Sequence, residues 1–158
     1  MTEHAMNLNE FLKENTQGML RLFVYGTLKR GFWNYDRFCR GVLDIREAEV
    51  RGRLYEMHSG IPVLQVPDGD VLTHGTADDW GRVYGELLTF DDPESRLPAI
   101  DRLEAFHPGG SNLYRRVLVP VCIEHDMALP IWAYVAGESL ENSSFKRLEV
   151  SIWNPEPR

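Results

Sequence analysis

The feature that most limits the fold is a succession of short segments rich in β-branched and aromatic residues, separated by glycines and prolines. Such segments are typical of β-strands, and many of them in a row predict a sheet of short strands. Together with a single clear helical segment, they indicate an α+β fold whose mostly antiparallel sheet is closed or strongly curled. The predicted strands are residues 22–25, 42–50, 52–57, 61–66, 82–90, 113–125 and 129–137.

Two residues refine this prediction. Pro62 cannot donate a ladder hydrogen bond, so we expect residues 61–66 to form an edge strand. Gly52 separates two strand-like segments and indicates a bend or bulge between them.

The helical segment lies within residues 91–107, and its prolines set the expected bounds. A proline breaks the interior of a helix but is tolerated in its first turn. We therefore expect a turn over residues 92–97 and a helix from about Pro98 to Phe106.

Glu104 lies on the face of this predicted helix that carries its apolar residues. At 100° per residue, Glu104 shares that face with Ile100 and Leu103, which should meet the sheet. The carboxylate could bend out to water or pair with an arginine. Alternatively, it could project into a pocket, where burial would raise its pKa and make it a usable base. Periodicity does not choose between these interpretations.

Length and charge narrow the class of protein. The chain has 158 residues, the size of one domain, and we expect an N-terminal arm or short helix in residues 1–20 followed by one domain over residues 21–158. A net charge of −7 argues against nucleic acid and anionic membranes as partners. The sequence has neither a signal-peptide pattern at its start nor a stretch of roughly 18 apolar residues. We therefore expect a cytoplasmic location.

The stretch RLFVYGTLKRG, residues 21–31, combines a buried strand with a polar turn. When a strand ends, its next N–H groups lose their ladder partners, and Gly26 has no side chain to block approach. The N–H groups of Gly26, Thr27 and Leu28 could therefore form a concave nest for an anion such as a carboxylate. The alternative is a plain hairpin turn, with Lys29 and Arg30 in solvent.

Other patterns point away from metal and nucleophilic chemistry. The histidines show no HxH or HExxH spacing, so we expect no metal site, and no GxSxG motif occurs. Cys39 and Cys122 are interpreted as small core residues with reduced thiols. Tyr114 follows a glycine-rich turn and is either structural or part of a pocket mouth.

Several motifs, in order along residues 21–136, resemble the gamma-glutamylcyclotransferase-like superfamily. VYGTLKRG resembles its YG[ST]LxxG signature, and GRVYGELLTF resembles its "GEL" strand. AIDRLEAF followed by LYRRVLVPV resembles its LDxxEG…YxR block, and WAYVAG is similar to its last strand. The compact YGTLKRG form favours the gamma-glutamylamine branch.

This resemblance implies a small mixed, mostly antiparallel β-barrel flanked by short helices, with one cavity. It implies an enzyme whose substrate is a small gamma-glutamyl amide or amine, cyclised by its own α-amine to give 5-oxoproline and a free amine. By the same resemblance, Glu104 is the general acid/base, residues 25–28 (Tyr25, Gly26, Thr27 and Leu28) bind substrate, Tyr114 is a pocket residue, and no cofactor is needed.

The sequence departs from the family pattern at one position: Ala105 stands where the family usually has glycine, which bears on substrate preference. The alternative function is a non-catalytic binding protein on the same fold, with Glu104 as the ligand of an ammonium group. The sequence does not indicate an oligomeric state.

Overall fold

The computed structural model describes residues 18–56, 60–66, 81–104, 114–124, 127–136, 146–148 and 151–153. The elements are β1 (Leu20–Val24), α2 (Tyr35–Phe38), β2 (Asp44–Glu56), β3 (Pro62–Gln65), β4 (Gly81–Phe90), α4 (Pro93–Leu103), β5 (Tyr114–Glu124), β6 (Met127–Ala136) and β7 (Lys146–Arg147). The predicted N-terminal arm up to residue 17 and Ala105 lie outside the described residues.

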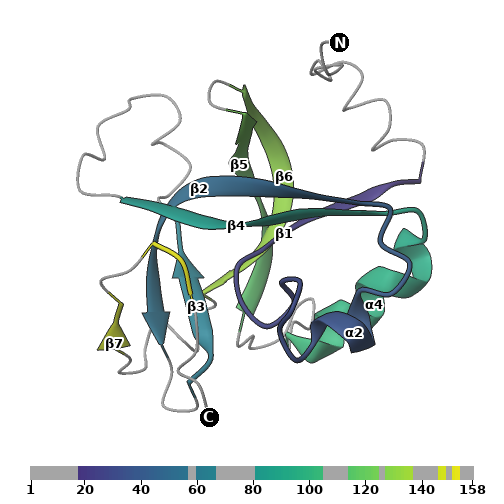
Figure 1. The fold of residues 1–158 in the computed structure, drawn as a ribbon, viewed down its shortest axis with the longest axis horizontal. Helices are drawn as coiled ribbons and strands as arrows, with labels where there is room; N and C mark the ends of the chain where they lie inside the picture. The colour runs from purple at the N-terminus through teal and green to yellow at the C-terminus, as the bar shows by residue number, and fades with distance from the viewer. Residues whose placement is uncertain are drawn as a thin grey trace.

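Five of the described strands close into a small mixed barrel. They follow one another in the order β2-β4-β1-β6-β5, and β5 pairs back onto β2. β1 runs antiparallel to β4 and parallel to β6, whereas the other neighbours in the barrel are antiparallel. The two described helices, α2 and α4, lie together beside the barrel (Figure 1). The predicted α+β class and the closed, mostly antiparallel sheet are confirmed.

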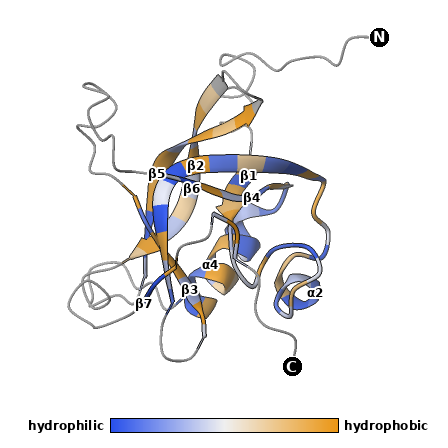
Figure 2. Ribbon diagram, turned by 60° about the vertical axis from the view of Figure 1, so that its left-hand side comes forward, coloured by the Kyte–Doolittle hydropathy of each residue, from blue (hydrophilic) through white to orange (hydrophobic). Residues whose placement is uncertain are grey.

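β2 is one long strand that changes its partner at Gly52. Hydrophilic and hydrophobic residues alternate along it, as Figure 2 shows by colour. Residues 44–52 pair with β4, and residues 53–56 pair with β3. The bend predicted at Gly52 is therefore the place where β2 leaves the barrel. β3 lies at the end of the strand order, which is the edge position predicted from Pro62.

Two layers of buried side chains hold the structure together. Alternating residues of the barrel strands form one cluster, and the opposite faces of β1, β4 and β6 form a second cluster with the helices. Every residue of β1 is buried because both of its faces are covered. Phe23 belongs to the first cluster, and its ring occupies the space beside Gly85. A Cβ on Gly85 would lie 2.8 Å from the Phe23 Cζ atom and 2.2 Å from the Val24 carbonyl oxygen.

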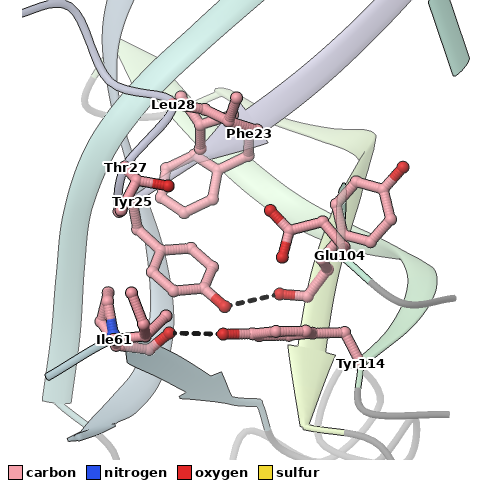
Figure 3. Close-up of a pocket in the computed structure, with 11 residues that line it drawn as sticks. Phe23, Tyr25, Thr27, Leu28, Ile61, Glu104 and Tyr114 are labelled. Atoms are coloured by element: carbon pink, nitrogen blue, oxygen red, sulfur yellow. Dashed lines mark hydrogen bonds between the residues drawn. The ribbon is translucent and has the colours of Figure 1, made fainter. Parts of the chain in front are cut away.

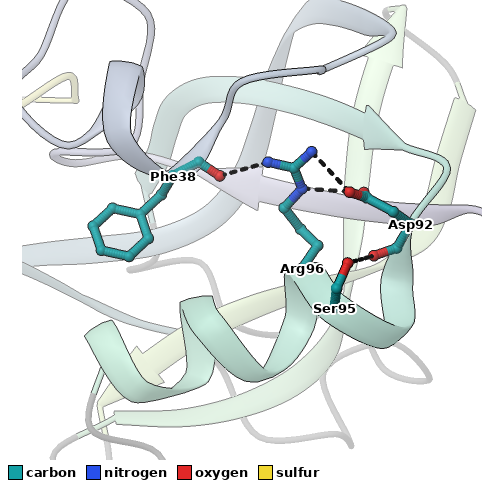
Figure 4. A network of polar contacts seen from close by, with 4 residues as sticks. All are labelled: Phe38, Asp92, Ser95 and Arg96. Atoms are coloured by element: carbon teal, nitrogen blue, oxygen red, sulfur yellow. Dashed lines mark hydrogen bonds and ion pairs between the residues drawn. The ribbon is translucent and has the colours of Figure 1, made fainter.

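The helix α4 begins earlier than the sequence predicted. It starts at Pro93, so the turn expected over residues 92–97 is wrong and Pro98 lies inside the helix. Arg96 holds the first turn: its guanidinium donates to Asp92 Oδ1 (3.1 Å) and Oδ2 (3.0 Å) and to the Phe38 carbonyl oxygen (3.0 Å) (Figure 4). These contacts stabilise a turn to which Pro98 cannot contribute a backbone donor.

No helix within the described part of the chain combines the length and the apolar character that a membrane span needs.

Candidate active site

A pocket opens between the end of α4 and the loop that follows β1. It encloses about 370 Å³ of empty space, part of which is open to solvent. Every site residue predicted from the sequence lies on this pocket, although they are spread over three separate segments. The lining residues are Phe23, Val24, Tyr25, Gly26, Thr27, Leu28, Ile61, Pro62, Glu104, Tyr114 and Tyr134.

Glu104 is placed in the pocket by the end of α4. It is the residue that caps the helix, and its backbone N–H donates to the Ile100 carbonyl oxygen at 2.9 Å. Figure 3 shows its carboxylate pointing towards Phe23 and Tyr25. Among the described residues, no donor or cation forms a hydrogen bond or ion pair with this carboxylate. Burial raises the pKa of Glu104 from 4.5 to about 7, because the ionised form has lost water without gaining a partner.

The Tyr25 side chain anchors the loop that faces Glu104. Its hydroxyl donates to the Tyr134 carbonyl oxygen at 2.7 Å and accepts from the Leu64 N–H at 3.1 Å. Burial, followed by the nearby Tyr114 and Glu104, raises the pKa of Tyr25 well above 10. The hydroxyl therefore stays protonated, and the phenol serves as a fixed link between the loop, β3 and β6.

The backbone carbonyl groups of the loop are hydrogen-bonded, whereas several of its N–H groups have no acceptor among the described residues. The carbonyl oxygen of Gly26 accepts from the Lys29 N–H, and that of Thr27 accepts from the Asn34 N–H, both at 3.0 Å. Asn34 Nδ2 also donates to Thr27 Oγ1 at 2.8 Å. Within the described residues, no acceptor is bonded to the N–H groups of Gly26, Thr27 and Leu28. Three successive residues at the pocket thus carry donors that no acceptor in the described part of the chain binds, and an anion-binding nest is built from such donors.

The reason for glycine at position 26 differs from the one expected. A Cβ built on Gly26 would lie 2.9 Å from the Pro62 Cγ atom. The space that a side chain would need is therefore filled by the edge strand β3, and is not kept open for a ligand. Gly26 allows the loop and β3 to pack closely, which closes one wall of the pocket.

The interpretation of the loop as a plain turn placed Lys29 in solvent, and the structure shows that this is wrong. Its side chain is buried, its Nζ donates to the Trp153 carbonyl oxygen at 2.9 Å, and it lies 4.7 Å from the centre of the Phe32 ring. Burial lowers the pKa of Lys29, partly offset by the nearby Glu86. Arg30 is exposed, as predicted, and pairs with Glu86 at 3.3 Å. Lys29 thus fastens the outer side of the loop to the segment at residues 151–153.

Tyr114 and Tyr134 complete the wall beside Glu104. The Tyr114 hydroxyl donates to the Pro62 carbonyl oxygen at 2.9 Å, as Figure 3 shows, and the Tyr134 hydroxyl donates to Asp101 Oδ1. Burial is the main cause that raises the pKa of both phenols, and the charge of Glu104 adds to it. Both tyrosines therefore stay neutral.

Five further pocket residues were not predicted from the sequence to line it. Phe23 and Val24 were interpreted as parts of a buried strand, Tyr134 as core or barrel filler, and Ile61 and Pro62 as parts of an edge strand. Their signal was weak because an apolar wall residue and a core residue look alike in sequence. Pro62 and Tyr134 could be assigned only through their contacts with residues far away in the chain.

Comparison with known proteins gives this arrangement a family context. The model of the family described as "Gamma-glutamyl cyclotransferase, AIG2-like" matches residues 22–154. The chain is also 29% identical over 118 residues to a Methanocaldococcus jannaschii protein named "Putative gamma-glutamylcyclotransferase". That alignment covers 75% of this chain and 85% of the relative.

Solved structures share the fold at low sequence identity. A mouse AIG2-like protein has a TM-score of 0.56 with 20% identity, over 89% of this chain and 99% of its own. Uncharacterised protein PH0828 of Pyrococcus horikoshii has a TM-score of 0.55 with 18% identity, over 82% of this chain and 86% of its own. YkqA of Bacillus subtilis has a TM-score of 0.55 with 21% identity over 85% of this chain, but this chain spans only 39% of YkqA.

Proposed function

This chain belongs to the gamma-glutamyl cyclotransferase, AIG2-like family, and we propose that it cyclises a gamma-glutamyl amide to 5-oxoproline and releases a free amine. The observation that carries the proposal is the position of Glu104. Its carboxylate lies without a partner from the described residues in a pocket that the loop of residues 25–28 also lines. A carboxylate of this kind can exchange protons near neutral pH.

Glu104 acts as the general acid/base in this proposal. The α-ammonium group of the substrate gives a proton to the carboxylate, and the freed amine attacks the γ-carbonyl carbon. Glu104 then returns the proton to the leaving nitrogen as the amide C–N bond breaks. The ring nitrogen loses its second proton to the released amine, which leaves as an ammonium ion. A pKa near 7 instead of 4.5 makes the first transfer about 3 kcal/mol less unfavourable.

The loop of residues 25–28 holds the substrate in this proposal. The unused N–H groups of Gly26, Thr27 and Leu28 suit the α-carboxylate of the glutamyl group. Because the attack is intramolecular, holding the chain folded for five-ring closure supplies much of the rate enhancement. The apolar and phenolic wall formed by Phe23, Ile61 and the tyrosines limits the access of water to the reacting atoms.

The first experiment measures 5-oxoproline from a panel of gamma-glutamyl amines, gamma-glutamyl dipeptides and glutathione. Glu104→Gln should lower kcat by about 10²- to 10⁴-fold, the usual contribution of a general acid/base. Glu94→Gln removes an exposed carboxylate from the same helix and serves as the matched control, with kcat unchanged. Full activity of Glu104→Gln would refute the assigned role.

A substrate analogue tests the loop. A 4-aminobutanoyl amide can form the same five-membered ring but lacks the α-carboxylate. If the nest binds that group, kcat/KM for the analogue should fall by about 10²-fold or more, because several charge-assisted hydrogen bonds are lost. Equal kcat/KM for both compounds would contradict the assignment. Binding of gamma-glutamyl compounds by calorimetry without any 5-oxoproline would favour the binding-protein alternative.

A further inference from the structure

Asp101 ties the end of α4 to the barrel beside the pocket. Arg116 Nη1 donates to Asp101 Oδ1 at 2.9 Å and to Oδ2 at 2.8 Å, and the Tyr134 hydroxyl also donates to Oδ1. Arg116 and Tyr134 are opposite each other in the register of β5 and β6. The side chains of Asp101 and Arg116 are 16% and 18% exposed. Two adjacent strands therefore present two donors to one carboxylate of the helix.

This cluster lies next to Glu104 along the helix and around the pocket. Asp101 lies three residues before Glu104, so the two side chains leave the helix end on neighbouring positions. Tyr134 lines the same pocket as Glu104, and the charge of Glu104 contributes to its raised pKa.

Among the described residues, the three tyrosines that line the pocket with Glu104 share one property: each phenol donates its proton to an acceptor other than Glu104. Tyr25, after β1, donates to a backbone carbonyl, and so does Tyr114, on β5. Tyr134, on β6, donates to Asp101, on α4 itself. Of the three acceptors, only that of Tyr134 is a side chain, and it belongs to the helix that carries Glu104. Asp101 is therefore the group that binds the Tyr134 proton beside the pocket of Glu104.

We propose that Asp101 is a positioning residue, which fixes the end of α4 through Arg116 and Tyr134 and keeps the Tyr134 hydroxyl from bonding to Glu104. A carboxylate that accepted this hydroxyl would be stabilised in its ionised form and would be a weaker base. Asp101 thus keeps Glu104 without a donor while holding it in the pocket. The consequence for turnover rests on the acid/base role proposed for Glu104.

Replacement of Asp101 should change Glu104 in a defined direction. In Asp101→Ala, a negative charge leaves the neighbourhood, Arg116 loses its ion pair with residue 101, and the Tyr134 hydroxyl loses its bond to residue 101. Each of these changes favours ionised Glu104, so its pKa should fall by about 1 unit. Tyr134→Phe alone should leave this pKa unchanged, because its hydroxyl does not contact Glu104. Tyr134→Phe added to Asp101→Ala should restore at least about half of the fall.

The measurement is a ¹³C NMR titration of protein labelled at the glutamate carboxyl carbons, with the Glu104 signal identified by its absence in Glu104→Gln. Asp92→Ala is the matched control, because it removes the contact with Arg96 at the opposite end of α4. This control should leave the Glu104 pKa unchanged. If Asp101→Ala does not fold, Asp101→Asn is measured instead, with the same expected fall in the Glu104 pKa. The single amide oxygen of the asparagine would accept from the charged Arg116 guanidinium, which leaves the Tyr134 hydroxyl without this acceptor.

The results that would overturn the proposal are equally specific. They are an unchanged Glu104 pKa in the Asp101 variant, a fall that persists in full in the double variant, or an equal fall in Asp92→Ala. With an active substrate, kcat of Asp101→Ala should fall by about 10-fold or more with a smaller change in KM. The titration needs no substrate, so an inactive protein would refute the proposed function and leave the role of Asp101 testable.

Discussion

Glu104→Gln should stabilise the protein, and the gain should grow as the pH rises. The carboxyl group has a pKa of about 7 in the folded protein and 4.5 as the reference for the unfolded chain. Between these values the folded state binds more protons than the unfolded state, so the free energy of unfolding decreases with increasing pH. Above about pH 7 the ionised carboxylate lowers the free energy of unfolding of the wild type by a constant amount. Glutamine has a similar shape but carries no charge, so Glu104→Gln avoids this loss of stability.

The magnitude follows from the two pKa values. One pKa unit corresponds to about 1.4 kcal/mol, so the full difference is about 3 kcal/mol. This is an upper value, because the pocket opens to solvent and water reduces the penalty. The difference between variant and wild type should therefore be small at about pH 4.5 and rise by up to about 3 kcal/mol at about pH 8.

Urea denaturation at several pH values from about 4.5 to about 8 gives the free energies of unfolding of the variant and the wild type directly. Other titrating groups affect wild type and variant alike, so they cancel in the difference. Glu94→Gln is again the control, and its difference from the wild type should stay flat over this range. A flat difference for Glu104→Gln as well would refute the claim that Glu104 is desolvated without compensation. Loss of activity with gain in stability is the expected signature of a functional carboxylate.

Three further predictions test the packing around the pocket. Gly26→Ala should cost about 1–3 kcal/mol of unfolding free energy by urea denaturation, because its Cβ would lie 2.9 Å from the Pro62 Cγ atom. Gly81→Ala, whose Cβ has no neighbour closer than 4.0 Å, should cost less and is the control. Tyr25→Phe should cost about 1–3 kcal/mol by the same measurement, because it leaves a buried carbonyl and a buried N–H unpaired. The Cys39 thiol is buried and its pKa is raised to about 12, so iodoacetamide should modify it, by mass spectrometry, only in unfolded protein; labelling under native conditions would contradict this.

The strands could be predicted because their signal is local. Residues 82–90 were predicted as a strand, and in β4 Val83 and Leu87 both belong to the cluster inside the barrel. A proline predicted the edge position of β3, and a glycine predicted the bend in β2. Closure of the barrel between β2 and β5 leaves no such local pattern, and it was expected in general terms from the number of strands and from family resemblance.

The parts that the sequence did not predict depend on contacts between distant segments. The start of α4 was placed too late, because the Arg96 contact with Phe38 outweighs the local effect of Pro98. Lys29 was placed in solvent, because its acceptor on Trp153 lies 124 residues away. Glu104 and the loop of residues 25–28 lie on one pocket, and their roles stay predictions until turnover is measured.

The parallel pairing of β1 with β6 has a consequence for biosynthesis. β1 emerges from the ribosome before both of its neighbours, β4 and β6, and the loop after it is fastened by Trp153 near the end of the described chain. The pocket therefore cannot take its final shape before residue 153 has been made. A fold dominated by such distant pairings is expected to form on a timescale of about milliseconds to seconds, which stopped-flow refolding would measure. Until β4 and β6 have been made, the apolar face of β1 is a natural target for a chaperone.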